Sequence, residues 1–398
     1  KTVVPDPSLH RETGDRRQET EYRREEEKGL LSPISYILHF QTETFMAQAI
    51  ETPQYEDEIL NYLTHLYDDP FRYGACRAEN AEAFAKWQEE ARPILMHLLG
   101  LESIAASLGN HQIRVERGPG EDMGDYTRHQ GFLYPEPNFQ LPFWYLRPKG
   151  EGPFPLALTP HGHDRIGMDT SAGVHHSEDH LSKIIEEDRD VAVQAVKRGF
   201  AAIAPATRGQ STIGIPDING RHGKRDCRSQ FMHALLAGRT ATGERVWDMM
   251  RLIDWAVALP EINLDHILVM GNSGGGVITL YTAAIDKRVS IAVPSCSYCS
   301  LIGENGLLHH CDCNAVPGIL RFGEIWDIAA LIAPRPLLIV NGKKDKLFPL
   351  PEVDRAVEGI CKHYTIAGAQ DQVQHQYGPE GHRFYKDLMW PFIDTHST

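Results

Sequence analysis

One serine of the chain lies in a setting that suits a nucleophile. Ser273 is at the centre of the sequence Gly-Asn-Ser-Gly-Gly, between an apolar run at 267–270 and an apolar helical pattern at 275–286. This G-x-S-x-G pattern between a strand and a helix is typical of a nucleophile elbow, in which side chains at Gly271 and Gly275 would collide with neighbouring elements. The N–H groups at the start of the helix favour developing negative charge. We therefore predict that Ser273 attacks a carbonyl carbon.

A serine hydroxyl is a weak nucleophile, so it needs a base and an acid that orients the base. Asp345 follows a buried strand predicted at 337–340, and His382 follows a strand predicted at 372–376. Both lie beyond the carboxyl ends of strands, where open α/β sheets place their chemistry, and the chain order Ser, Asp, His fits a nucleophile elbow. We predict His382 as the base and Asp345 as the acid. Asp327 is the alternative acid, but it precedes the strand and is expected to cap a helix.

The oxyanion of an acyl-transfer reaction needs two N–H donors that are already in place. One is expected to be the backbone N–H of Gly274, next to the serine. The other is expected in the loop after an apolar strand, which reads His-Gly-His at 161–163. We assign it to the backbone of His163, with Gly162 as the next candidate. The neighbouring His161 and Asn272 are predicted to contact the substrate.

These residues require a sheet whose strands end at one edge. Short apolar runs alternate with helical patterns, which predicts βαβ units and an α/β fold whose mostly parallel central sheet carries helices on both faces. Three earlier runs, separated by Gly and Pro, predict an antiparallel entry to the sheet. The strands are expected at 111–116, 126–133, 141–146, 155–158, 201–204, 267–270, 291–293, 337–340 and 372–376, and the helices at 188–198, 242–258, 275–286, 351–363 and 383–393.

The part of the chain before the sheet divides by composition. Residues 1–41 are expected to form a tail, because the run 11–28 is almost entirely polar with mixed charge. Pairing of this run with another subunit is the alternative, so a homo-oligomer stays open. From 42 to 109 the apolar residues recur at helical spacing, which predicts a helical segment. The catalytic domain is expected to cover 110–398.

Charge and composition exclude several classes of partner. The net charge of −14 over 398 residues argues against nucleic acid and against anionic lipid, both of which attract basic surfaces. No apolar run reaches the roughly 18 residues of a membrane span. The small, odd number of cysteines favours a reducing compartment, so we expect a cytoplasmic protein. Because the chain starts at Lys1, a secreted protein whose leader was removed is the alternative.

Two groups of cysteines and histidines invite a zinc interpretation. Cys296 and Cys299 form one pair, and Cys311 and Cys313 follow two histidines in the other. However, the first pair follows a predicted core strand, and cysteine is among the residue types most often buried. We expect a loop folded over the pocket, with no metal and no cofactor. Three further histidines, His175, His176 and His180, are likewise expected to be loop residues beside the cleft rather than ligands.

Taken together, these motifs resemble the α/β-hydrolase superfamily, in the branch related to dienelactone hydrolases and acetyl xylan esterases. The resemblance covers roughly residues 80–395, and its motifs are specific for fold and triad. It implies the α/β-hydrolase fold and ester hydrolysis without a cofactor, often of acyl groups on plant polysaccharides. Dienelactone hydrolases proper carry cysteine at the elbow, so Ser273 favours the esterase side. The matching stretches are 161–163, 238–240, 245–248, 271–276, 310–317, 331–337 with Asp345, and 381–382.

The function expected from the sequence is a serine carboxylesterase that forms an acyl-enzyme. Its substrate would be a short-chain acyl ester, with a small molecule or a carbohydrate as the alcohol. A peptidase related to the prolyl oligopeptidases is the first alternative, although the 110 or so residues before the sheet show no repeats that could build a propeller. A hydrolase fold without activity that serves as a binding protein is the second alternative. It is disfavoured because serine, acid and base are all present.

Overall fold

The computed structural model describes residues 61–62, 65–66, 71–211, 220, 223, 225–303, 306–307 and 311–397. The tail predicted at 1–41 lies outside these residues, as does most of the run 42–70. Residues 56–398 belong to one compact unit.

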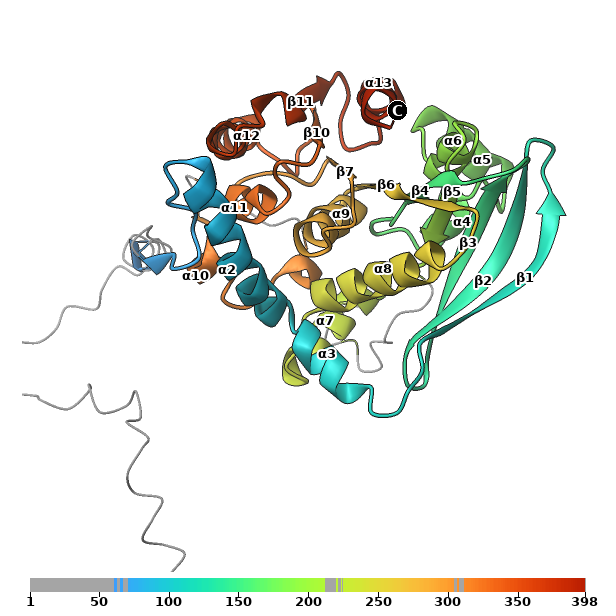
Figure 1. Cartoon of the computed structure of the whole chain (residues 1–398), viewed down its shortest axis with the longest axis horizontal. Helices are drawn as coiled ribbons and strands as arrows, with labels where there is room; N and C mark the ends of the chain where they lie inside the picture. The colour runs from blue at the N-terminus through green and yellow to red at the C-terminus, as the bar shows by residue number, and fades with distance from the viewer. Residues whose placement is uncertain are drawn as a thin grey trace, which may run out of the picture. The chain divides into compact units, whose positions relative to one another are not determined.

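The described residues form a twisted sheet of nine strands in the order β1-β2-β3-β5-β4-β6-β7-β10-β11 (Figure 1). The first three strands form an antiparallel meander that pairs with β5, and the strands from β5 to β11 are parallel to one another. The predicted antiparallel entry and parallel core are therefore confirmed. The bounds are β1 Arg114–Asp122, β2 Tyr126–Glu136, β3 Phe139–Pro148, β4 Phe154–Leu158, β5 Ala201–Pro205, β6 Ile262–Asn272, β7 Ile291–Ser295, β10 Leu337–Gly342 and β11 Val373–Gly378; β8 Ile302–Gly303 and β9 Gly306–Leu307 pair separately.

Helices cover both faces of the sheet. In Figure 1, α2, α8 and α9 lie on one face, and α6 and α13 lie on the other. The five helices predicted after residue 110 correspond to α6, α8, α9, α12 and α13, whereas α4, α5, α7 and α10 were not predicted. The bounds are α2 Ala81–Leu99, α3 Leu101–Ser107, α4 Gly167–Ser171, α5 Glu178–Glu186, α6 Val191–Val196, α7 Asp226–Leu236, α8 Ala241–Val257, α9 Gly274–Ile285, α10 Ile319–Phe322, α11 Ile325–Ala330, α12 Leu350–Ile366 and α13 Lys386–His396.

The strands divide the core between these two layers. Side chains alternate along a strand, so neighbours point to opposite faces. In β4, Leu156 and Leu158 pack into the cluster beneath α8 and α9, whereas Ala157 packs into the cluster beneath α6 and α13. Because both faces are covered, the buried parts of the central strands, such as 267–270 of β6, are apolar, as their sequences predicted.

Helix α2 packs into the same core as the sheet. Its start is capped by Asn80, whose side chain accepts from the Ala83 N–H at 2.9 Å, and it ends at Gly100 in the left-handed region, with φ 77°. Leu95 and Leu99 are fully buried against the cluster beneath α8 and α9. Helix α2 is therefore part of the packed structure that supports the sheet.

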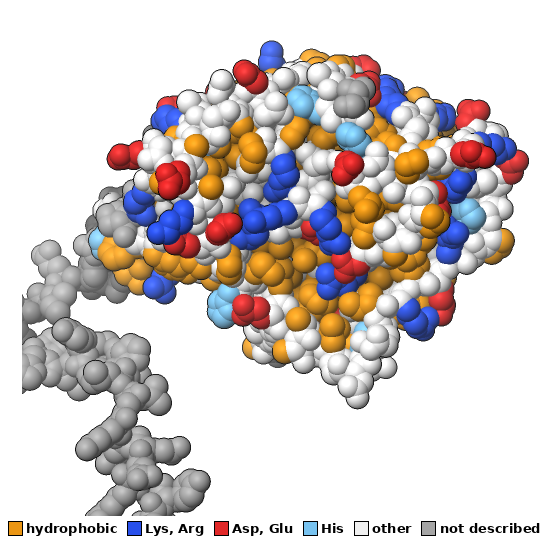
Figure 2. Space-filling view, in the orientation of Figure 1, with side chains coloured by type: hydrophobic (Ala, Val, Ile, Leu, Met, Phe, Trp, Pro, Cys, Tyr) orange, Lys and Arg blue, Asp and Glu red, His pale blue; other side chains and the backbone are white. Residues whose placement is uncertain are grey.

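On the face shown in Figure 2, lysine and arginine side chains lie among acidic ones rather than in a separate basic area. Among the helices that the structure describes, none combines the length and the apolar character needed to cross a membrane.

Candidate active site

Ser273 lies on a sharp turn between β6 and α9. Its backbone has φ 59° and ψ −123°, a strained conformation for a residue with a side chain. A Cβ atom at Gly271 would lie 2.5 Å from the Pro160 carbonyl oxygen, and one at Gly275 would lie 2.1 Å from the same atom. Both glycines are therefore required by the close approach of the loop after β4, as the G-x-S-x-G pattern predicted.

Asp345 and His382 meet beyond the ends of β10 and β11. These strands are parallel and in register to Gly342 and Gly378, so the loops that follow them leave the sheet at the same edge. The Nδ1 atom of His382 lies 2.7 Å from Oδ2 of Asp345, and the Asp345 side chain is almost completely buried. The other carboxylate oxygen accepts from the Leu347 N–H at 2.9 Å. The carboxylate is thus fixed in position and holds the proton of His382 on Nδ1.

Ser273 and His382 line one cavity of about 320 Å³. No hydrogen bond between the Ser273 hydroxyl and the His382 ring is formed within the part of the chain that the structure describes. Such contacts are often longer before a substrate binds and shorten in the complex. The shared cavity and the orientation of His382 by Asp345 leave Nε2 as the ring nitrogen that can accept the serine proton.

The loop predicted to complete the oxyanion hole passes directly beside the elbow. A Cβ at Gly162 would lie 3.0 Å from the backbone nitrogen of Gly274 and 3.1 Å from the Ser273 Cβ. Gly162 and His163 also line the cavity. Within the described residues, the backbone N–H groups of His163 and Gly274 have no acceptor. Two free donors beside a nucleophile are what an oxyanion hole needs.

Comparison with known proteins finds solved structures that share this fold. No family model matches the chain. YtaP of Bacillus subtilis (strain 168), a protein named as a hydrolase, is 28% identical over 251 residues, which are 61% of this chain and 78% of YtaP. A structure named as an acetyl xylan esterase, from Bacteroides fragilis NCTC 9343, superposes with a TM-score of 0.66 at 17% identity and covers 87% of this chain and 97% of its own. A glucuronoyl esterase from Solibacter usitatus superposes with a TM-score of 0.55 at 13% identity, covering 80% and 94%.

The chain has the α/β-hydrolase fold. The resemblance predicted from the motifs is thereby confirmed for the fold.

Within this α/β-hydrolase fold, His161 lines the cavity, and both of its ring nitrogens are hydrogen-bonded to the protein. Its Nε2 accepts from the Thr207 N–H at 3.0 Å, so Nδ1 carries the proton donated to the Gly162 carbonyl at 2.7 Å. Burial lowers the pKa of His161 to about 4, which keeps the ring neutral. Asn272 lines the cavity, but its Oδ1 accepts from Ser295. The contacts of both residues hold the walls of the cavity in place.

Asp327 has the structural role that its position in the sequence predicted. It lies in the first turn of α11, where its carboxylate accepts from the Glu324 N–H at 2.8 Å as part of a capping box. The same side chain also accepts from the Cys76 N–H at 2.9 Å. Asp327 therefore stabilises the start of α11, and Asp345 is the carboxylate that contacts His382.

The cavity also has a charged wall that the sequence motifs did not reveal. Glu187, Arg189 and Arg383 line it together with the catalytic candidates. Arg383 donates to Asp188 at 2.9 Å, and Arg189 donates to Glu187 at 2.7 Å. These residues come from the segment after α5 and from the residue after His382. No motif marks such residues, because their position depends on how the α5–α6 loop folds back over the sheet.

The two groups of cysteines separate in the structure. Cys296 is buried at the end of β7, where its thiol donates to the Arg383 carbonyl, and Cys299 packs against Phe348 and Val353. Cys311 and Cys313 instead lie with two residues from elsewhere in the chain, His163 and Cys227. Of the histidines expected in a loop, His176 pairs with Asp169, whereas His180 lies in α5 rather than in a loop and pairs with Thr170.

Proposed function

We propose that this protein is a serine carboxylesterase that uses Ser273, His382 and Asp345 as its catalytic triad. The observation that carries the proposal is the 2.7 Å hydrogen bond from His382 to a buried Asp345, together with the strained Ser273 that lines the same cavity as His382. Perturbed or strained groups of this kind gather at functional sites. The names of the structural relatives, which include esterases, support ester bonds as the target.

In the proposed mechanism, the Ser273 oxygen attacks the ester carbonyl while its proton moves to Nε2 of His382. Asp345 stabilises the imidazolium that forms. The tetrahedral oxyanion accepts hydrogen bonds from the N–H groups of Gly274 and His163. His382 then returns the proton to the leaving alcohol, and the C–O bond breaks to give an acyl-enzyme. Water, activated by the same histidine, hydrolyses the acyl-enzyme to release the acid and regenerate the serine.

We further propose a short acyl group as the substrate's acid part, on a carbohydrate or another small alcohol. A cavity of about 320 Å³ is at the small end for ligand pockets and is shared between the acyl group and part of the alcohol. The acetyl xylan esterase and glucuronoyl esterase names of the relatives favour a carbohydrate ester. Charged side chains such as Arg189 at the cavity wall suit the polar surface of a sugar.

Replacing Ser273 with alanine tests the proposal. Hydrolysis of 4-nitrophenyl acetate should fall to the background rate, whereas the exposed Ser182→Ala should keep the wild-type rate. Circular dichroism should show that both variants fold. Turnover by a folded Ser273→Ala protein would refute the triad. Absence of turnover by the wild-type protein on every ester, with binding retained, would favour the inactive binding protein.

A panel of esters and peptides tests the proposed class of substrate. 4-Nitrophenyl esters of increasing chain length should be measured beside acetylated sugars, methyl-esterified sugar acids and short proline-containing peptides. We expect kcat/KM to be higher for acetyl than for octanoyl esters, and higher for acetylated sugars than for peptides. The opposite chain-length order would contradict the small acyl site, and faster peptide cleavage would favour the peptidase alternative.

A further inference from the structure

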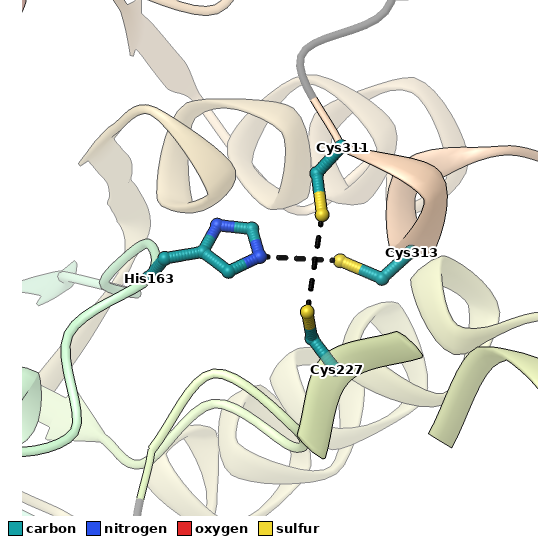
Figure 3. Close-up of side chains that lie close together, drawn as sticks. All are labelled: His163, Cys227, Cys311 and Cys313. Carbon is teal, nitrogen blue, oxygen red and sulfur yellow. Dashed lines mark hydrogen bonds between the residues drawn. The ribbon is translucent and has the colours of Figure 1, made fainter. Parts of the chain in front are cut away.

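A second cluster of reactive side chains lies beside the proposed oxyanion hole. Figure 3 shows His163, Cys227, Cys311 and Cys313 pointing toward one another. His163 comes from the loop after β4, and Cys227 comes from the first turn of α7. Cys311 directly precedes the short helix η3 (Asp312–Asn314), and Cys313 lies within it. The four ligand atoms all lie within 4.8 Å of one another. Three separate segments therefore converge on one point.

The distances within this cluster match the edges of a metal-centred tetrahedron. With Zn–S bonds of about 2.3 Å and Zn–N bonds of about 2.05 Å, tetrahedral angles put two sulfurs about 3.8 Å apart and a sulfur and a nitrogen about 3.6 Å apart. The Cys227 and Cys311 sulfurs lie 3.8 Å apart, and Nε2 of His163 lies 3.5 Å from the Cys313 sulfur. A disulfide would bring two sulfurs to about 2.05 Å.

A buried arginine beside the cluster supplies an independent observation. Arg245 is only 1% exposed, and none of the ion pairs of the described residues gives it a carboxylate partner. Its guanidinium instead donates to the Cys313 sulfur at 3.4 Å, and to neutral oxygens of Cys313, Asn314 and Gln230. A buried charge is costly without an opposite charge nearby. Three thiolates, one neutral imidazole and a divalent cation carry a net charge of −1, which balances this arginine.

We propose that His163, Cys227, Cys311 and Cys313 bind one zinc ion. Soft thiolates with one imidazole in a tetrahedral arrangement favour zinc over calcium, magnesium or manganese. Since the chain supplies all four ligands, no position is left for a substrate, and the site is structural rather than catalytic. This proposal departs from the sequence-based expectation of no metal. That expectation weighed Cys311 and Cys313 together with Cys296 and Cys299, and it did not include Cys227 or His163.

The position of the site suggests what the metal does for the hydrolase, and this part rests on the proposed function. The backbone of His163 is the proposed second oxyanion donor, so a metal bound to its ring would fasten that loop. Gln210 connects the cluster to the elbow, because its amide donates to Cys313 at 3.5 Å and lies 2.6 Å from where a Cβ of Gly274 would be. Loss of the metal should therefore loosen the oxyanion hole.

Metal analysis of the purified full-length protein tests the site directly. After any affinity tag is removed and the protein is dialysed, we expect one zinc per chain. Cys227→Ser and Cys313→Ser should each reduce this to less than about 0.2 equivalents. The matched controls are Cys361→Ser, at an exposed cysteine, and Cys299→Ser, at a buried one, and both should keep one equivalent. Ser273→Ala should also keep its zinc, which separates this proposal from the proposed esterase function.

Several results would overturn the proposal. The proposal is wrong if zinc-free protein takes up neither zinc nor cobalt when titrated. It is also wrong if Cys227→Ser and Cys313→Ser both keep their zinc. A mass two units lower with two fewer free thiols would show a disulfide instead. Should the variants fail to fold, cobalt substitution of the wild-type protein still decides the question. Intense visible bands of tetrahedral cobalt with thiolate charge transfer are expected, and their absence would contradict the four-ligand set.

A kinetic measurement tests the proposed fastening of the loop. Misplacement of reacting groups by about 1 Å can cost about 10² in rate. Folded protein stripped of zinc should therefore lose up to about 100-fold in kcat with little change in KM, and zinc should restore it. An unchanged kcat in metal-free protein would refute the effect on the oxyanion hole, while the metal content would still report on the site itself.

Discussion

Replacing Asp345 with asparagine separates the electrostatic part of the proposed triad from its shape. In the structure, one carboxylate oxygen of Asp345 accepts from the Leu347 N–H and the other accepts from Nδ1 of His382. An asparagine keeps the first contact only if its carbonyl faces Leu347, so its NH₂ group must face His382. The histidine would then carry its proton on Nε2 and could not accept the proton of Ser273.

The size of the effect follows from two contributions. Turning the amide to restore the correct tautomer would leave the Leu347 N–H without an acceptor, at about 1–3 kcal/mol. Losing the carboxylate charge near the developing imidazolium removes about 4 kcal/mol at a separation of about 4 Å and an effective dielectric constant of about 20. Together these are about 5–7 kcal/mol, or about 10⁴–10⁵ in kcat. A similar replacement in a well-studied serine protease costs about 10⁴.

Initial rates with 4-nitrophenyl acetate should show this loss in kcat with little change in KM, because Asp345 does not line the cavity. Asp327→Asn is the control, since it changes the same group in the capping box of α11. It should keep kcat and lower the melting temperature, because one buried N–H loses a charged acceptor at about 1–3 kcal/mol. Activity within tenfold of wild type in Asp345→Asn, together with an inactive but folded Asp327→Asn, would refute the assignment of the acid.

Two further predictions concern the walls of the site. Gly275→Ala should lower kcat by about 10²–10³, because its Cβ would lie 2.1 Å from the Pro160 carbonyl oxygen and would displace the loop that carries the oxyanion donor His163. Gly118→Ala, whose Cβ would lie 3.4 Å from its nearest neighbour, should be tolerated. Equal activity in the two variants would contradict the steric argument. Burial lowers the pKa of His161 to about 4. Between pH 7 and 5 this histidine therefore becomes protonated in the unfolded chain but stays neutral in the folded one, which should lower the free energy of unfolding by about 2 kcal/mol. Urea unfolding should show that the free energy of unfolding falls about 2 kcal/mol less in His161→Gln than in the wild-type protein between pH 7 and 5. An equal fall in the two proteins would contradict a neutral, buried imidazole.

The sequence predicted the sheet and the arrangement of its ends well. Strand β10 and the second half of β6 are buried on both faces, so each appears in the sequence as a continuous apolar run, which is a local signal. The elbow was also recognisable, because the turn packs against the loop after β4. Only glycine at 271 and 275 avoids the carbonyl oxygen of Pro160 in that loop. The place of Asp345 and His382 followed from strand order alone.

The missed features depend on contacts between segments far apart in the chain. Helix α7 has weak amphipathic character. No local motif marks Cys227 as a partner of Cys313, which follows it by 86 residues (313 − 227). The charged wall with Arg189 likewise depends on how the loop before α6 folds. His161 lines the cavity as predicted for a residue at the substrate, but the sequence did not show that its ring bonds to Thr207 of another segment. Spacing in the sequence cannot show such partners, because the fold rather than the neighbouring residues supplies them.

The central claim, that Ser273 is an activated nucleophile, is tested most directly by covalent labelling. A fluorophosphonate reacts only with a serine whose hydroxyl is activated by a base and whose oxyanion is stabilised, and peptide mapping by mass spectrometry identifies the residue. We expect one label per chain, on Ser273, with loss of esterase activity in proportion to labelling, and no label in unfolded protein or in His382→Ala. Labelling of a different serine, or full activity in protein labelled at Ser273, would contradict the account.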